Sequence, residues 1–258
     1  MAVWPAGRTA RRESFYTAGV NKGPFLAQRA GVRGCAEEVR VIIPARFNGP
    51  PGSGNGGWCA GVFAAASGLG GVVEVTLRQP PPLETPLALD GGEVRDPDGG
   101  LIAQVRGVDE VPQVVPPVDA DTARAASAAY PGLVDHPFPG CFVCGPDRTD
   151  GLRIFPGPLP DGRTAAPFTA PGEVSTATVW AALDCPGGWA VIGPGRPYVL
   201  GRIAAVLDGL PSPGDECVVT GVADGTRGRK AVVRTSLYAP DGRLLGRAVA
   251  AWIALSGA

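Results

Sequence analysis

The chain has 258 residues, of which 45% are hydrophobic and 18% charged, a composition typical of a globular protein rather than a disordered one. A net charge of −1 and the lack of a basic stripe with interleaved aromatic residues argue against nucleic acid as a partner. No apolar run reaches the length of a membrane span. The basic segment Met1 to Arg12 lacks the apolar core of a secretory signal, so we expect the cytoplasm, where the 6 cysteines would stay reduced.

The 39 glycines and 28 prolines fall between apolar runs, which predicts short strands joined by tight turns. Residues 1–37 show no clear periodicity, and we expect a disordered arm there. Residues 38–117 form the first organised half. Its expected elements are a strand at Val39–Phe47, a buried helix at Gly56–Ser67, and strands at Val72–Leu77, Leu87–Leu89 and Leu101–Val108, the last after a turn at Asp96–Gly99.

Residues 118–140 form a connector with a short helix that ends before Pro131 and is capped by Asp119 or Asp121. Residues 141–258 form the second half, in which the order of elements is the same. The expected elements are strands at Leu152–Phe155 and Arg163–Phe168, a helix at Ser175–Leu183 capped by Ser175 or Thr176, strands at Val199–Leu207 and Cys217–Val222, and a return strand at Leu244–Leu255.

The two halves share more than the order of their elements. PDGGLIAQV at Pro97–Val105 matches PDGRLLGRA at Pro240–Ala248 in the turn and the first return residues. Because such turns also recur by chance, the shared order of strand, buried helix and antiparallel strands is the stronger sign of an internal duplication.

Three stretches, Gly54–Trp58, Val72–Leu87 and Cys141–Ile154, resemble sequences of the hotdog-fold thioesterases of the phenylacetate-type acyl-CoA family. Gly54–Trp58 (GNGGW) resembles the HGG or NGG turn at the start of the family's central helix, and Val72–Leu87 resembles the strand and bend that follow it. Cys141–Ile154 (CFVCGPDRTDGLRI) is similar to the entry segment CFxCGxxNPxGL. The resemblance implies an α+β double hotdog: two tandem units, each a curved antiparallel sheet wrapped around a central helix.

The resemblance also implies active sites between such units, where the N-terminus of one helix faces an acid on the other. In the family the acid lies about two and a half helical turns beyond the glycine turn. Here Ala64 stands nine residues after Asn55, whereas Asp184 stands nine residues after Ser175. The first half keeps the turn without the acid, and the second keeps the acid without paired glycines. One composite active site between the halves is therefore expected.

In that site Asp184 would act as base or nucleophile, the Gly57 amide as oxyanion donor, and Asn55 as the group that orients the thioester or the water. Gly56 would let the thioester oxygen approach the helix closely. Each feature also has a simpler interpretation. The Asn-Gly turn could serve only to start a helix, and Asp184 could merely end one ahead of Cys185.

Three further side chains are candidates for substrate binding. Trp58 and Trp180 could line an acyl tunnel, and Arg78 could meet the phosphates of coenzyme A. Core packing and surface solvation are the alternative interpretations. The expected partner is an acyl-CoA or an acyl-carrier thioester, with coenzyme A as part of the substrate and no other cofactor. A further homodimer of double hotdogs stays open.

Cys141 and Cys144 have the spacing of a zinc knuckle, but the other cysteines are scattered and no second pair completes four ligands, so we expect no metal. Two other functions stay open. One is a hotdog protein that binds an acyl or other apolar ligand without turnover. The other is a hydratase or dehydratase, which pairs an aspartate with a histidine; the one histidine is His136, outside the helix region.

Overall fold

The computed structural model describes residues 28–30, 38–193 and 195–255. In chain order its elements are β1 (Gln28–Ala30), β2 (Glu38–Val41), η1 (Ala45–Phe47), α1 (Gly56–Ser67), β3 (Val72–Leu77), β4 (Leu87–Asp90), β5 (Glu93–Arg95), β6 (Leu101–Val108), α2 (Ala120–Ala128), η2 (Pro131–Leu133), β7 (Gly157–Pro158), β8 (Thr164–Thr169), α3 (Thr176–Gly188), β9 (Tyr198–Leu207), β10 (Glu216–Arg227), β11 (Lys230–Tyr238) and β12 (Leu244–Ala254).

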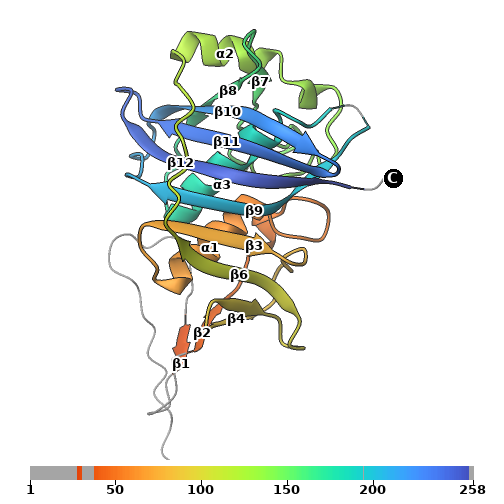
Figure 1. The fold of residues 1–258 in the computed structure, drawn as a ribbon. Coiled ribbons are helices and arrows are strands. Elements are labelled where there is room, and N and C mark those ends of the chain that lie inside the picture. The colour runs from red at the N-terminus through yellow and green to blue at the C-terminus, as the bar shows by residue number, and fades with distance from the viewer. Residues whose placement is uncertain (1–27, 31–37, 194, 256–258) are drawn as a thin grey trace, which may run out of the picture.

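The strands form one antiparallel sheet of 12 strands in the order β1-β2-β4-β5-β6-β3-β9-β12-β11-β10-β8-β7 (Figure 1). At its middle β3 pairs with β9, with Val73 opposite Ala205 and Thr76 opposite Arg202. This single pairing joins the strands of the first half to those of the second. The two halves therefore share a continuous sheet.

The helices α1 and α3 pack against each other and against the sheet, whereas α2 packs on β7 and β8 at one end of the sheet (Figure 1). Residues Gly57 to Ala64 of α1 are all buried, as are Ala177 to Gly188 of α3. The sheet covers one side of each helix and the partner helix covers another. This explains why both sequences are apolar all round instead of along one stripe.

Asn55 caps α1 by accepting a hydrogen bond from the amide of Trp58 at 2.9 Å, a cap that was not predicted from the sequence. The cap predictions for α2 and α3 are confirmed. Ser175 caps α3 and forms a reciprocal capping box with Thr178. The cap of α2 is Asp119.

The predicted end of the second helix at Leu183 is wrong, because α3 continues to Gly188 with Pro186 inside it. A proline there removes one helical N–H group. Hydroxyl groups of neighbouring strands bind carbonyl oxygens in this turn. Thr235 donates to the Leu183 carbonyl at 2.6 Å, and Thr164 donates to the Pro186 carbonyl at 2.7 Å. Tertiary contacts thus hold the last turn in helical form.

Three predicted strands differ from the structure. One of them, Cys217–Val222, is observed as the longer strand β10 (Glu216–Arg227). The strand predicted at Val39–Phe47 ends at Val41, and η1 takes up Ala45–Phe47 after a proline that lacks an N–H group. Residues 152–155 form no strand; their amides bind the preceding loop, with Leu152 N–H donating to the Phe142 carbonyl at 2.8 Å. The expected disordered arm lies outside the described residues except at 28–30, which pair with β2. Among the described residues, no helix is both long and apolar enough to cross a bilayer.

The contact between α1 and α3 predicts the effect of a single methyl group. A Cβ at Gly61 would lie 2.7 Å from both Ala177 Cα and Trp180 Cβ. We expect Gly61→Ala to lower the free energy of unfolding by about 1–3 kcal/mol, despite the better helix propensity of alanine. Urea unfolding measures this change. The control is Gly70→Ala, where a Cβ meets nothing within 4 Å; equal stability of the two variants would contradict the close helix contact.

Candidate active site

The contact between the helices brings Asp184 to the N-terminus of α1. The Gly57 amide donates a hydrogen bond to Asp184 Oδ2 at 2.8 Å. A Cβ on Gly57 would lie 2.4 Å from Asp184 Cβ and 2.8 Å from the Trp180 carbonyl oxygen, so glycine alone fits here without displacement. The glycine turn of the first half and the acid of the second half are therefore in direct contact.

The Asp184 carboxyl group lies in surroundings that disfavour its charge. The residue is 2% exposed, and burial raises the pKa of this carboxyl to about 7, against the lowering effects of the Gly57 amide and the Asn55 side chain. Among the described residues, Asp184 Oδ1 is buried and has no hydrogen-bond partner. One carboxylate oxygen is thus bound by the helix N-terminus, whereas the other is unpartnered within the described chain.

In the first turn of α1, one backbone amide has no hydrogen-bond acceptor among the described residues. The Trp58 amide donates to Asn55 Oδ1, the Cys59 amide to the Asn55 carbonyl, and the Gly57 amide to Asp184. Within the described chain, the Gly56 amide donates to no protein acceptor. The helix dipole adds partial positive charge at this end. The open N–H group at the site therefore belongs to Gly56, one residue before the predicted oxyanion donor.

A cavity of about 420 Å³ lies beside these groups. Asn55, Gly56 and Asp184 line it, so the helix start and the acid open onto the same space. The rest of the wall is mostly apolar and comes from the loops around the two helices and from β9 and β12: Pro50, Pro81, Phe138, Trp189, Ile192, Tyr198, Leu200, Trp252 and Ile253. Cavities of such size and character hold small organic ligands.

Two of the predicted substrate-binding residues lie away from this cavity. Trp58 stacks on Phe47 with ring centroids 3.7 Å apart and is 4% exposed. Trp180 is 3% exposed and packs at Gly61 between the helices. Neither contributes to the cavity lining, which agrees with the alternative interpretation of core packing. The aromatic walls are instead Phe138, Trp189, Tyr198 and Trp252. Tyr198 and Trp252, which lie on strands, carry no sequence signal beyond ordinary alternation.

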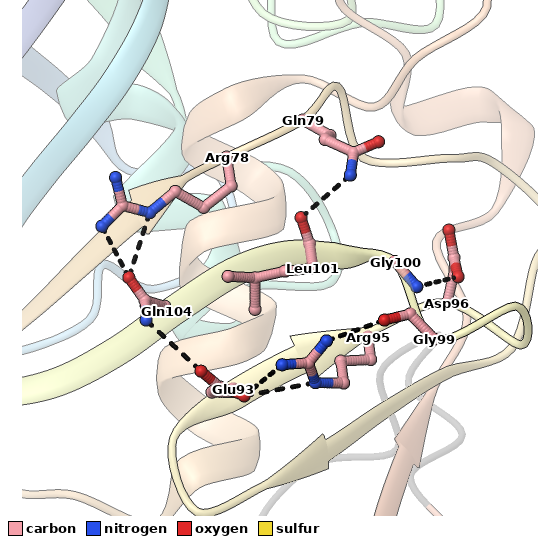
Figure 2. Close-up of polar contacts among 9 residues, drawn as sticks. All are labelled: Arg78, Gln79, Glu93, Arg95, Asp96, Gly99, Gly100, Leu101 and Gln104. Carbon is pink, nitrogen blue, oxygen red and sulfur yellow. Dashed lines mark hydrogen bonds and ion pairs between the residues drawn. The ribbon is translucent and has the colours of Figure 1, made fainter.

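Arg78 lines the cavity, and Figure 2 shows the polar contacts of its side chain. Its guanidinium donates to Gln104 Oε1 from Nε at 3.0 Å and from Nη2 at 2.6 Å. Gln104 in turn donates to Glu93, which forms an ion pair with Arg95 at 2.6 Å. This chain of contacts links the Arg78 guanidinium through Gln104 of β6 to Glu93 and Arg95 of β5 (Figure 2). Arg78 also borders a second, more polar hollow that Arg202 and Lys230 line.

A group of cysteines forms another part of the cavity wall. The sequence placed Cys185 apart from Cys141 and Cys144, but the sulfur atoms of all three lie within 4.8 Å of one another. The continuation of α3 past Asp184 brings Cys185 to the pair. Hydrogen bonds from the Cys144 and Cys185 thiols lower the pKa of Cys141 well below its ordinary value. Three buried thiols thus lie next to Asp184.

His136 also lines the cavity, but both of its ring nitrogens have close neighbours. Nδ1 accepts a hydrogen bond from the Phe138 amide at 2.8 Å, and Nε2 lies 3.4 Å from the Cys144 sulfur. Burial lowers the pKa of this imidazole, which favours its neutral form. The aspartate–histidine pair of a hydratase would need a free imidazole nitrogen, and here both are engaged.

No protein-family model matches the sequence, and no curated protein sequence is significantly similar to it. Solved structures are similar in fold. A candidate thioesterase from Novosphingobium aromaticivorans is 16% identical, with a TM-score of 0.58 over 87% of this chain and 98% of that one. A candidate thioesterase II from Thermobifida fusca is 12% identical, with a TM-score of 0.58 over 89% and 95%. A hotdog-fold protein of unknown function from Alicyclobacillus acidocaldarius is 13% identical, with a TM-score of 0.55 over 88% and 96%.

These similarities cover most of the chain, so the predicted fold is confirmed: the protein is a double hotdog. In this fold the two central helices are α1 and α3, and the shared sheet surrounds them. At identities of 12% to 16% the likeness concerns the fold alone. The activity has to be argued from the site.

Burial of Asp184 leads to a prediction about stability. A carboxylate with one unpartnered oxygen is costly to bury, whereas an asparagine can keep the bond from the Gly57 amide without the charge. We expect Asp184→Asn to be as stable as the wild type at pH 8, or more stable by about 1–2 kcal/mol. Urea unfolding measures the difference. A loss of more than about 2 kcal/mol would mean that Asp184 holds the fold together instead of serving a reaction.

Proposed function

We propose that the protein hydrolyses acyl thioesters at one composite site between its two halves. One observation carries this proposal: Asp184 from α3 and the N-terminus of α1 open onto the same apolar cavity. Thioester hydrolysis needs a donor for the developing oxyanion and a carboxylate or activated water for attack at the carbonyl carbon. The thioesterase descriptions of two solved structures with this fold support the same reaction class.

The free groups of the site suit the two tasks of the reaction. The Gly56 N–H group would bind the thioester carbonyl oxygen, assisted by the dipole of α1. Asp184 Oδ1, which has no partner among the described residues, would take a proton from the attacking water or attack the carbonyl carbon itself. The acid product and a free thiol would result. Gly57 would hold Asp184 in place through its amide.

Asn55 has a positioning role in this proposal. Its Oδ1 caps α1, so its orientation is fixed, and its Nδ2 lies 3.7 Å from the sulfur of Cys141, which also lines the cavity. At 3% exposure it is held too firmly to change orientation freely. A fixed amide next to Gly56 would orient the thioester group as it enters.

The preferred substrate in this proposal is a coenzyme A thioester. The apolar cavity would take the acyl group, and the polar hollow of about 760 Å³ outside it would take the phosphates. The two spaces share Leu77, Arg78, Gly201 and Ile253 in their walls, so one extended ligand could occupy both. Arg78, Arg202 and Lys230 supply positive charge in the outer hollow.

The reaction is tested by thiol release from short, long and aryl acyl-CoAs. We expect Asp184→Asn to lower kcat by about 10²–10⁴-fold, because it removes the acid–base group and leaves the cavity intact. The control is Asp109→Asn, a change at an exposed carboxylate remote from the cavity. Asp184→Asn with full activity would contradict the role of this residue. A folded wild type that binds acyl-CoA without releasing thiol would favour the non-catalytic binding protein.

The coenzyme A assignment is tested by the contribution of Arg78. We expect Arg78→Ala to raise KM about 2–5-fold for an acyl-CoA and to leave KM unchanged for the acyl-pantetheine, which lacks the nucleotide phosphates. Steady-state kinetics on both esters give the comparison. Arg124→Ala on α2 is the control, since Arg124 lies outside both cavity linings. Equal KM changes for the two esters would exclude a phosphate contact by Arg78.

A further inference from the structure

The cavity wall next to Asp184 has the geometry of a metal site. The sulfur atoms of Cys141, Cys144 and Cys185 lie within 4.8 Å of one another, and each of these residues is at most 5% exposed. Thiolates around a tetrahedral zinc ion lie about 3.8 Å apart, because zinc–sulfur bonds are about 2.3 Å long. The three sulfur atoms therefore lie at most about 1 Å farther apart than zinc would hold them.

The backbone around two of these cysteines is a tight turn with knuckle spacing. The Gly145 amide donates to the Cys141 carbonyl at 2.9 Å and closes the turn. A Cβ on Gly145 would lie 2.3 Å from the Pro139 carbonyl oxygen and 2.5 Å from the Cys141 nitrogen, so the turn requires glycine. The sequence Cys-x-x-Cys-Gly therefore has a structural reason: it folds back and directs both sulfur atoms toward the third, on α3.

N–H groups lie close to two of the three sulfur atoms. Asn55 Nδ2 lies 3.7 Å from the Cys141 sulfur, and His136 Nε2 lies 3.4 Å from the Cys144 sulfur. Because His136 Nδ1 accepts from the Phe138 amide, the neutral ring carries its proton on Nε2 and directs it at the sulfur. In metal sites, hydrogen-bond donors next to the ligand atoms orient those ligands. N–H groups close to sulfur are therefore what a site with metal-bound thiolates would have.

We propose that Cys141, Cys144 and Cys185 bind one zinc ion as thiolates, with water from the cavity as the fourth ligand. His136 and Asn55 serve as N–H donors to the sulfur atoms. Thiolate ligands favour zinc over hard cations, and three protein ligands with an open position are the ligand count of reactive zinc sites. The ion ties the loop of Cys141 and Cys144 to α3 at the residue after Asp184, and so braces the acid.

Metal content of the full chain, purified without chelators, tests the site. We expect about one zinc ion per chain by elemental mass spectrometry, falling to less than about one-tenth in Cys141→Ser, Cys144→Ser and Cys185→Ser. Cys217→Ser is the matched control, because Cys217 is equally buried but lies on β10, outside the group. Thiol release is assayed separately, so failure of the zinc site and failure of the proposed reaction are distinguishable.

Cobalt substitution tests the ligands in the unaltered protein. Co²⁺ added to the chelated wild type should give thiolate-to-cobalt charge-transfer bands and the visible spectrum of tetrahedral coordination. His136→Ala should weaken zinc affinity about 10–100-fold and keep the stoichiometry, with recovery in His136→Gln, which retains an N–H donor.

Three results would overturn the proposal. One is a purified protein without zinc that gives no charge-transfer band with Co²⁺. Another is a Cys141–Cys144 disulfide, seen by mass spectrometry of the unreduced protein with no metal bound. The third is complete loss of metal in His136→Ala, which would make His136 a ligand instead of an outer donor.

Discussion

The close approach of α1 to α3 is the contact on which the site depends. Two glycines permit it: a Cβ at Gly57 would meet Asp184, and one at Gly61 would meet Ala177 and Trp180. Side chains at these positions would separate the helices and move the acid off the amide that holds it. Both helices are buried between this contact and the shared sheet. The packing that stabilises the fold therefore also assembles the candidate active site.

Fusion of the two halves allows them to differ in their contributions. In the first half the glycine turn gives an open amide at a helix N-terminus, and Ala64 occupies the position that spacing would give to an acid. The second half contributes the acid, and Ser175 with its capping box stands where the glycine turn would be. A homodimer of single hotdogs would carry two equivalent sites, whereas the described part of this chain brings the glycine turn of one half to the acid of the other, at Gly57 and Asp184.

Much of the fold followed from the sequence because its signals are local. The helix at Gly56–Ser67, the strand at Val72–Leu77, the hairpin before Leu101–Val108 and the caps Asp119 and Ser175 depend on short-range pattern and hydrogen bonding. The meeting of Asp184 with the glycine turn came from the family resemblance together with the spacing along the two helices, and the geometry agrees with it.

The parts that the sequence did not predict depend on tertiary contacts. Pro186 argued for a helix end, yet α3 runs on, and the hydroxyl groups of Thr164 and Thr235 on neighbouring strands bind carbonyl oxygens in its last turns. That continuation brings Cys185 close to Cys141 and Cys144, which lie more than forty residues earlier in the chain. The spacing of cysteines along the sequence does not predict this contact. Likewise, the alternation of apolar and polar residues along β9 and β12 does not predict which face of these strands lines the cavity.

The most direct measurement is a crystal structure with a non-hydrolysable acyl-CoA analogue, in which a methylene group replaces the thioester sulfur. The account predicts that the acyl chain fills the cavity, with its carbonyl oxygen about 2.7–3.1 Å from the Gly56 nitrogen and its carbonyl carbon beside Asp184. An analogue bound outside the cavity, or inside it with the carbonyl directed away from the start of α1, would contradict a composite site between the two halves.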